Sequence, residues 1–359
     1  MYDQIREDIF FFMFYASVAM LSLIACCYLL FRRSNAIAPD VKPPARLRRW
    51  TAAYFAATTL CHLWYLPTYF LSSSGDMMLS YLIAVLLDCI TVIPLTIIIL
   101  FAMLQDRRRP LWPVVVMVAP LIAGLAWCIA TRNEAILPML YAYILLMWLG
   151  LITYMVRATR QYGRWLRDNY ADLEHKEVWQ SFVVLAIILL VYAIYLLDVG
   201  ETIYEYAMEV INIVLICYLL WRVETLSDLS LHQTTLVASP AKNIGPLLKQ
   251  HCEEPQLYLQ HDISLPQLAQ TIGTNRLYLS QYFSNQGTTY NAYINDLRIN
   301  HFVSLYREAV NSKRSITAQQ LALESGFHSY NTFRDAFKRK MGQSVTAWKK
   351  AQYGGGGET

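Results

Sequence analysis

Residues 321–338, LALESGFHSYNTFRDAFK, decide the fold predicted for the last third of the chain. Leu321 and Ala322 precede Gly326, and the conformational freedom of glycine suits a tight turn after a short helix. Beyond the turn, apolar residues recur at helical spacing and predict an inward-facing stripe, formed by Phe333, Ala336 and Phe337. The other face of this second helix is polar and carries Tyr330, Asn331, Arg334 and Lys338. The stretch therefore predicts two short helices joined by a turn.

The same pattern occurs earlier in the chain, over residues 265–283. The first helix is predicted from an apolar stripe of Leu265, Leu268, Ala269 and Ile272. Gly273 ends that helix, and Thr274 or Asn275 can cap the next one through its side-chain oxygen. The second helix turns inward Leu277, Leu279, Tyr282 and Phe283, and outward Asn275, Arg276, Tyr278, Ser280 and Gln281. A connecting helix, Tyr293–Arg307, is expected between the two patterns.

Residues from about Ile244 to Lys350, just under a third of the chain, resemble the C-terminal domain of the AraC-type regulator family. The resemblance rests on the order and spacing of LYL at 257–259, SLPQLA at 264–269, NRLYLSQYF at 275–283, GTTYNAYIN at 287–295 and SGFHS at 325–329. The sequence departs from the family pattern at Val345, where proline is usual, and at Trp348, where tyrosine is common. The resemblance implies two helix-turn-helix units, set about one DNA turn apart, that bind double-stranded promoter DNA.

Side chains that point outward from the two second helices are the candidates for DNA contact. Arginine reads guanine, and asparagine or glutamine reads adenine, so the expected base readers are Arg276, Gln281, Asn331 and Arg334. Expected phosphate anchors are Ser280, Ser329, Lys338, Arg339 and Lys340, and Asn275, Tyr278 and Tyr330 complete the set. For any single residue a solvated helix face is an equal alternative. Residues 242–353 carry 13 Lys and Arg against seven acids, a modest basic surplus that suits phosphate contacts.

The first 222 residues have the character of a membrane protein. The whole chain is 56% hydrophobic and 16% charged, and its apolar residues gather in seven runs. The runs are Ile9–Phe31, Ala52–Leu71, Leu79–Leu104, Leu111–Ala130, Ile136–Val156, Gln180–Val199 and Tyr206–Trp221. Most hold 20 or more residues, the length that crosses a bilayer as a helix. The predicted fold is all-α, with a seven-helix transmembrane bundle (1–222), a linker (223–243), the double helix-turn-helix domain (244–353) and a disordered tail (354–359).

The loops between the runs predict an orientation. Basic residues number six in 32–50, three in 105–110 and five in 157–179, whereas the alternate loops 72–78, 131–135 and 200–205 hold only Arg132. Positive residues favour the cytoplasmic side, so the N-terminus is expected outside and the C-terminal domain in the cytoplasm. The third basic loop mixes charges and aromatic residues at helical spacing. It is expected either to lie along the membrane surface or to touch the DNA-binding part.

Several polar residues within or beside the apolar runs are candidates for sensing a signal. Glu205, Glu209 and Asn212 recur at i, i+4 and i+7, which places them on one face of the last run. The set is completed by His62 and Asp88 near the middle of their runs, and by Asp198 and Glu201 at the end of the sixth run. Ionisable groups in lipid usually face protein, water or a functional site. The functional interpretation is a polar pocket; the alternative is hydrogen bonding between helices and hydration at the interface. No metal site is expected.

Together these patterns predict a one-component regulator in the bacterial cytoplasmic membrane, with no enzymatic activity and no cofactor. Its expected partners are promoter DNA, membrane lipid, an unknown signal molecule or membrane partner, and a second copy of the chain. Two alternatives stay open. The membrane part could bind a protein that regulates the DNA-binding domain, or it could be transporter-like, although no internal repeat is evident. The signal, the promoters, the sign of regulation and release by proteolysis are not readable from the sequence.

Overall fold

The computed structural model describes residues 8–32, 35–39, 41–173, 176–195, 202–229, 244–312 and 317–353. Within these ranges the chain is helical, and one isolated antiparallel bridge joins Tyr170 to Ser264. The all-α prediction is confirmed. The chain forms two compact units. The N-terminal unit comprises Met1–Tyr162 and Val178–Leu229, and the C-terminal unit comprises Gly163–Glu177 and Ser230–Thr359.

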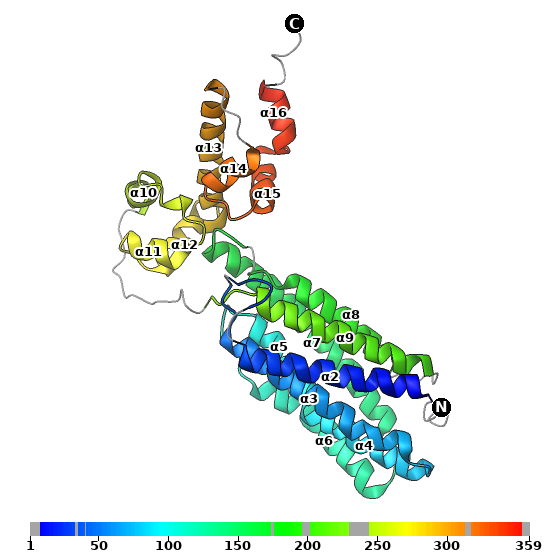
Figure 1. Ribbon diagram of the computed structural model, residues 1–359. Helices are drawn as coiled ribbons and strands as arrows, with labels where there is room; N and C mark the ends of the chain where they lie inside the picture. Colours follow the sequence, from blue (N-terminus) through cyan, green and yellow to red (C-terminus); the bar gives the residue numbers. More distant parts are fainter. Residues whose placement is uncertain are drawn as a thin grey trace. The chain divides into compact units, whose positions relative to one another are not determined.

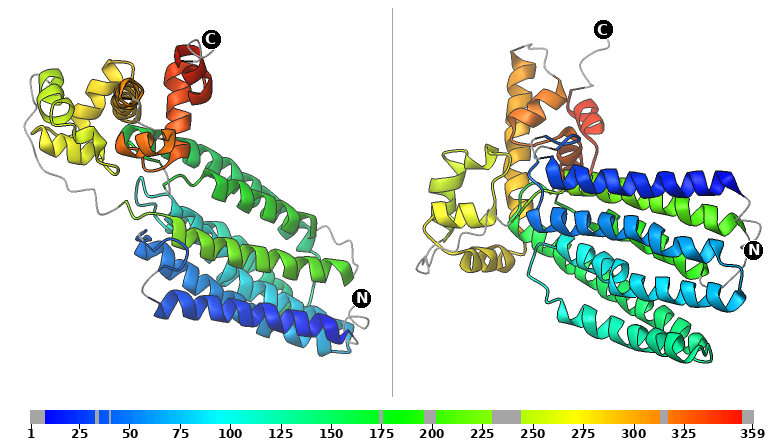
Figure 2. Two further views of the ribbon diagram at one scale, coloured as in Figure 1. Left: turned by 45° about the horizontal axis from the view of Figure 1, so that its top comes forward. Right: turned by 60° about the horizontal axis from the view of Figure 1, so that its bottom comes forward.

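The described helices of the N-terminal unit run side by side as a bundle (Figures 1 and 2). They are α2 (Ile9–Phe31), α3 (Ala45–Phe70), α4 (Ser74–Ile90), α5 (Val92–Met103), α6 (Trp112–Thr131), α7 (Leu137–Asn169), α8 (Trp179–Tyr195) and α9 (Thr202–Thr225). The carboxylate of Asp8 caps α2 by accepting from the amides of Phe10 and Phe11 at 3.0 and 3.1 Å. The division between the units falls within α7, whose residues after Tyr162 belong to the C-terminal unit.

The third predicted run, Leu79–Leu104, is not one helix. Helices α4 and α5 meet at Thr91, three residues before Pro94. Proline has no amide proton to donate, and its ring clashes with the carbonyl four residues earlier, which here is Ile90. The helix therefore breaks at the last residue of α4.

Apolar side chains cover much of the outside of this bundle as well as its inside. On α2, Phe11 is fully buried, while its neighbour Phe10 is 75% exposed. A helix that is apolar all round suits a hydrocarbon environment. Among the described residues, five helical stretches are long and apolar enough to cross a membrane, namely Ile9–Phe31, Ser74–Met103, Trp112–Thr131, Leu137–Asn169 and Glu205–Thr225. Each of the seven predicted runs overlaps a described helix, but the number of spans stays a prediction.

The C-terminal unit contains two helix-turn-helix pairs joined by a long helix (Figure 1). Its elements are α10 (Ile244–Leu248), the π-helical turn η2 (Lys249–Glu253), the 3₁₀ turn η3 (Leu257–Leu259), α11 (Leu265–Thr271), α12 (Arg276–Asn285), α13 (Tyr290–Asn311), α14 (Ala318–Glu324), α15 (Tyr330–Met341) and α16 (Val345–Tyr353). The connecting helix predicted at 293–307 lies within α13.

Helix α13 contributes to two separate hydrophobic cores. Its first turns place Tyr290 and Ile294 in a core with α11 and α12, the first half of the unit. Its later turns place Ile299 and Phe302 in a core with α14, α15 and α16, the second half. Val345 and Trp348, the two departures from the family pattern, are both buried in this second core. Both side chains therefore add apolar volume to this core.

Candidate DNA-binding surface and candidate ligand cavity

The first helix-turn-helix, α11–α12, is built by local hydrogen bonds that its sequence dictates. The side chain of Gln267 accepts from the amide of Ser264 at 2.8 Å and so caps the start of α11. Gly273 makes the turn with a φ of +73°, a value that favours glycine. The Oδ1 atom of Asn275 accepts from the amide of Tyr278 at 2.9 Å. Asn275, predicted to contact DNA, is therefore already engaged as the cap of α12.

The second helix-turn-helix, α14–α15, repeats the same devices. Thr317 and Gln320 cap the start of α14 reciprocally, each side chain accepting from the other's amide at 3.2 Å. Gly326 makes the turn with a φ of +86° and lies against η3. A Cβ atom at Gly326 would come within 2.7 Å of the Cα of Leu259, so close packing as well as the turn requires glycine. Ser329 caps α15 by accepting from the amide of Thr332 at 3.3 Å.

The structure separates the predicted DNA contacts into exposed residues and residues that support the helices. Exposed on the two second helices are Arg276, Tyr278, Gln281, Asn331, Arg334, Lys338 and Arg339. Half-buried are Asn275, Ser280, Ser329 and Tyr330, and the ring of Tyr330 packs against Phe333 of the second core. Lys340 donates from its Nζ to the Asp296 carbonyl and Asn300 Oδ1 at 2.8 and 2.9 Å. Lys340 thus ties α15 to α13.

Residues Gly163–Glu177, which we call the docking segment, belong to the C-terminal unit. Ala171 is fully buried within the first core. Tyr170 pairs with Ser264, the residue that precedes α11. Asn291 of α13 donates from its Nδ2 to the carbonyls of Tyr170 and Ala171 at 3.1 and 2.6 Å. Of the two predicted positions for the third basic loop, these contacts favour the one against the DNA-binding part.

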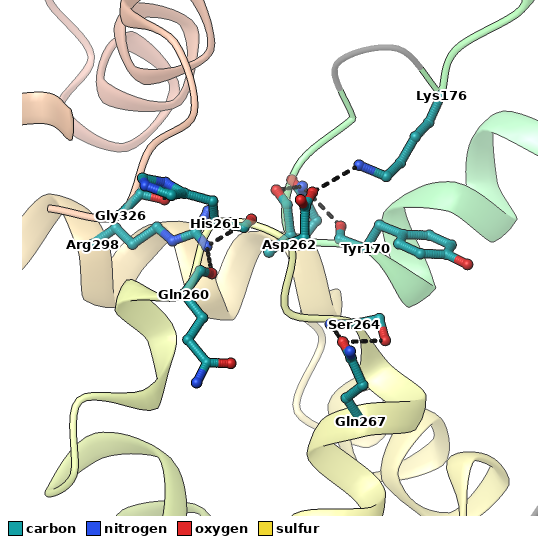
Figure 3. Close-up of polar contacts among 11 residues, drawn as sticks. Tyr170, Lys176, Gln260, His261, Asp262, Ser264, Gln267, Arg298 and Gly326 are labelled. Carbon is teal, nitrogen blue, oxygen red and sulfur yellow. Dashed lines mark hydrogen bonds and ion pairs between the residues drawn. The ribbon is translucent and has the colours of Figure 1, made fainter. Parts of the chain in front are cut away.

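Charged groups add to the docking. The Nζ of Lys176 lies 3.5 Å from Oδ1 of Asp262, as Figure 3 shows beside Tyr170 and Ser264. The guanidinium of Arg276, an expected base reader, lies 5.9 Å from the ring centre of Trp165. This distance is within the range of a cation–π interaction. The docking segment therefore touches both the core of the first half and one of its predicted DNA contacts.

The buried side chain of Arg298, on α13, binds the loop that precedes α11 in the first half of the C-terminal unit. Its Nε donates to the Tyr258 carbonyl at 2.7 Å, and its Nη2 donates to the Gln260 carbonyl at 2.6 Å (Figure 3). His261, in the same loop, contacts the Gly326 carbonyl through its Nδ1 at 3.1 Å. Burial lowers the pKa of Arg298 to about 10, which leaves the group charged at neutral pH. The sequence gives no sign of this buried role, because an arginine at this position of α13 could equally face solvent.

A cavity of about 300 Å³ lies inside the N-terminal unit, and each of the helices α2 to α9 supplies residues to its wall. Five of the seven predicted sensing residues line it: His62, Asp88, Glu205, Glu209 and Asn212. The other two, Asp198 and Glu201, lie outside the described residues. The structure therefore brings together residues from α3, α4 and α9. Their role in sensing stays a prediction.

Several polar groups in the cavity wall have hydrogen-bond partners within the N-terminal unit. The Nε2 of His62 lies 3.1 Å from Oε2 of Glu209. Asp88 accepts from the Tyr65 hydroxyl at 2.9 Å and from the Trp64 indole at 3.2 Å. The Tyr69 hydroxyl donates to Glu205 at 3.2 Å. Among the described residues, no group of three or more His, Cys, Asp or Glu side chains could hold a metal ion.

Sequence reasoning missed the aromatic part of this wall. The cavity is lined by seven aromatic residues, Tyr15, Tyr54, Tyr65, Tyr69, Tyr81, Tyr141 and Trp148. A signal was present, because His62, Tyr65 and Tyr69 stand at i, i+3 and i+7 and so share a face of α3. Tyrosines are also common near membrane interfaces, however, so their presence in this run does not by itself indicate a cavity wall.

Comparison with known proteins identifies one region. A family model described as Helix-turn-helix domain, of the AraC type, matches residues 268–351. No curated protein and no solved structure matched the chain. The matched region runs from α11 through α16 and includes both helix-turn-helix pairs. The chain therefore carries a DNA-binding domain of transcription regulators at residues 268–351.

Proposed function

We propose that this protein is a membrane-embedded one-component transcription regulator. The N-terminal unit crosses the bacterial cytoplasmic membrane with its N-terminus outside, and it senses a signal in its cavity. The C-terminal unit binds promoter DNA sequence-specifically in the cytoplasm. One observation carries this proposal: the docking segment, which separates two apolar helices in the chain, is folded into the core of the DNA-binding unit.

Membrane embedding is supported by composition and by charge. Five helical stretches have the length and hydropathy of membrane spans. The loops 32–50, 105–110 and 157–179 share 14 basic residues and fall on one side in a seven-span topology. That side also holds the docking segment and the DNA-binding domain. A cytoplasmic docking segment can meet a cytoplasmic DNA-binding domain, so the topology and the docking contacts agree.

Helix α7 provides a route from the signal to the DNA. Its residues Leu137, Leu140 and Trp148 line the cavity, and its last residues lie in the C-terminal unit. Because an α-helix is stiff over this length, a rotation or shift of α7 at the cavity moves Trp165 and Ala171. Trp165 lies against Arg276 and Ala171 is buried in the first core. A bound signal can thereby alter how the first half meets DNA.

DNA binding is assigned to the exposed faces of α12 and α15. Arg276 and Gln281 from α12, and Asn331 and Arg334 from α15, have the donors and acceptors that read base edges in the major groove. Lys338 and Arg339 lie in the last turn of α15 and suit phosphate contacts. Two recognition helices on one rigid α13 would read two neighbouring segments of one DNA site.

The proposal is tested by genome-wide crosslinking of the full-length protein to DNA in cells. Discrete promoter peaks are expected for the wild type, and they should disappear in the Arg276→Ala/Arg334→Ala double variant. Arg307→Ala is the matched control, since Arg307 is an exposed arginine on α13 that is not assigned to a base or phosphate contact. Membrane fractionation of the same cells should find each variant in the membrane. Peaks that survive the double substitution, or a protein found in the soluble fraction, would contradict the proposal.

A further inference from the structure

Leu277, the second residue of α12, is an apolar residue on the outward face of the helix. The sequence pattern predicts it on the inward face, and this prediction is wrong, because Leu277 is 71% exposed. Successive residues of an α-helix are about 100° apart, so Leu277 lies about 160° around the helix axis from Leu279. Leu279 is fully buried in the first core. Leu277 therefore points away from that core.

The neighbours of Leu277 on this face are expected DNA contacts. Gln281, four residues later, lies on the same side of the helix, and Arg276 comes directly before Leu277. Both neighbours are exposed. Single exposed apolar residues are common on protein surfaces, so exposure by itself indicates no partner. The position of Leu277 does, because the first residues of a recognition helix are those that contact base edges in the major groove.

The second helix-turn-helix shows which residue of α15 is equivalent to Leu277. Each recognition helix buries its fourth and eighth residues, namely Leu279 and Phe283 in α12, and Phe333 and Phe337 in α15. The two helices therefore correspond residue by residue. The second residue is Leu277 in α12 and Asn331 in α15, and both are exposed. The position that offers an amide group in the second half offers only hydrocarbon in the first.

The chemistry of the major groove indicates which base a leucine fits. Every base presents hydrogen-bond donors or acceptors there, and the isobutyl group of leucine can pair with none of them. The apolar group in the groove is the 5-methyl group of thymine. Contact between the two removes apolar surface of both partners from water, which is favourable. An asparagine at the same position has the amide that pairs with adenine.

We infer that Leu277 contacts the 5-methyl group of a thymine and so makes the first half of the DNA-binding unit selective for thymine at one position. The inference rests on the proposed function and deepens it, because it names a specificity-determining residue and the base that this residue prefers. The two halves thus recognise different bases from the same position of the same helix geometry.

The first test is the selection of binding sites from a random double-stranded DNA library by the full-length protein in lipid nanodiscs. The wild type should enrich a sequence with a preferred thymine. Leu277→Ala, whose side chain is three carbon atoms shorter, should lose the preference at that base pair alone. Leu323→Ala makes the same change at an exposed leucine of α14, outside the recognition helices, and should keep the whole preference. The melting temperature checks that each variant is folded.

The second test isolates the methyl group, because deoxyuridine differs from thymidine only in lacking it. Uracil in place of the thymine that Leu277 reads should weaken binding of the wild type by about three- to fivefold, the effect of one buried methyl group. The same replacement should not change binding of Leu277→Ala. Uracil in place of a thymine outside the selected sequence should not affect the wild type. Equal affinity of the wild type for the thymine and uracil sites would overturn the inference.

The two tests separate the failure of this inference from the failure of the proposed function. A wild type that enriches no sequence would refute sequence-specific DNA binding and the role of Leu277 with it. An enriched sequence without a methyl-dependent thymine, or with a thymine preference that survives in folded Leu277→Ala, would refute only the role of Leu277. A methyl-dependent thymine that is lost in Leu277→Ala and kept in Leu323→Ala supports both.

Discussion

The two halves of the DNA-binding unit share one design but differ in what completes them. Each has a capped first helix, a glycine turn with positive φ and a second helix with an exposed polar face. The second core is formed by α13 to α16 alone, with Phe302, Phe327, Phe333 and Trp348 at its centre. The first core also takes in Ala171 from the docking segment. The core of the first half is therefore completed by the docking segment, whereas no residue of that segment belongs to the described core of the second half.

The recognition helices differ in the same way. Arg276 at the start of α12 lies against Trp165 of the docking segment. Arg334 on α15 pairs at 3.6 Å with its neighbour Asp335, and both side chains are well exposed. Exposed ion pairs of this kind contribute little, so Arg334 is free to contact DNA. Under the proposed function, a signal from the membrane would therefore act on the first half, whereas the second half would supply constant affinity for DNA.

The largest effect is expected from a cavity-creating substitution in the core of the second half. Phe333 is fully buried and its ring centre lies 4.4 Å from that of Phe302. Phe333→Ala should lower the free energy of unfolding of the second half by about 3–5 kcal/mol. Amide exchange in α14 and α15 measures this. Leu323→Ala, at a residue 41% exposed on α14, is the control and should change exchange little.

A comparable disruption of the first half should come from the docking segment. Ala171→Asp places a carboxylate in the first core, and an uncompensated buried charge costs about 3 kcal/mol or more. The segment should undock, and protease cleavage within residues 265–285 of the membrane-bound protein should accelerate. Ala347→Asp makes the same change at an exposed site on α16 and should leave the cleavage pattern unaltered.

A smaller effect is expected from removing a single docking hydrogen-bond donor. Asn291→Ala takes away both bonds to the carbonyls of Tyr170 and Ala171. The loss of these two buried hydrogen bonds should reduce the docking free energy by about 1–3 kcal/mol, while Asn295 still donates to the Ala171 carbonyl at 3.4 Å. Thermal unfolding of the full-length protein should show an earlier transition than in Asn311→Ala, which changes an exposed residue of the same helix. Identical transitions in the two variants would mean that these bonds do not hold the segment.

The smallest effect is expected from removing the cation–π contact between Trp165 and Arg276. Trp165→Ala removes a contact of about 0.5–1 kcal/mol and should release Arg276 for DNA. Affinity for a target promoter should then rise by about two- to fivefold, measured by gel shift with protein in lipid nanodiscs. Trp179→Ala, at an exposed tryptophan that starts α8, should leave affinity unchanged. Weaker binding would instead show that Trp165 positions Arg276 for DNA.

Much of the fold was predictable because its signals are local. The run Ile9–Phe31 matches α2 in both bounds, and the glycines at 273 and 326 mark both turns. The position of the docking segment was left open between two alternatives. Ala171 is a single small residue in a polar stretch, and its partners lie about 90 to 120 residues away in the sequence. No local pattern encodes such a contact.

The cavity was predictable only where its residues follow a local pattern. Spacing along α9 placed Glu205, Glu209 and Asn212 on one face, and similar depths suggested His62 and Asp88 as neighbours. The tyrosines come from several helices, and only the packing of the bundle shows that they share a wall with the carboxylates. Spacing and depth along the sequence therefore predicted a polar pocket but not its aromatic wall.

We infer that the docking segment and the first half unfold as one cooperative unit. Hydrogen exchange of the full-length protein in detergent, wild type beside Ala171→Asp, tests it most directly. Exchange is expected to be faster in both 163–173 and 265–285 of the variant and unchanged in 318–341. Faster exchange confined to 163–173, with α11 and α12 as protected as in the wild type, would contradict the claim.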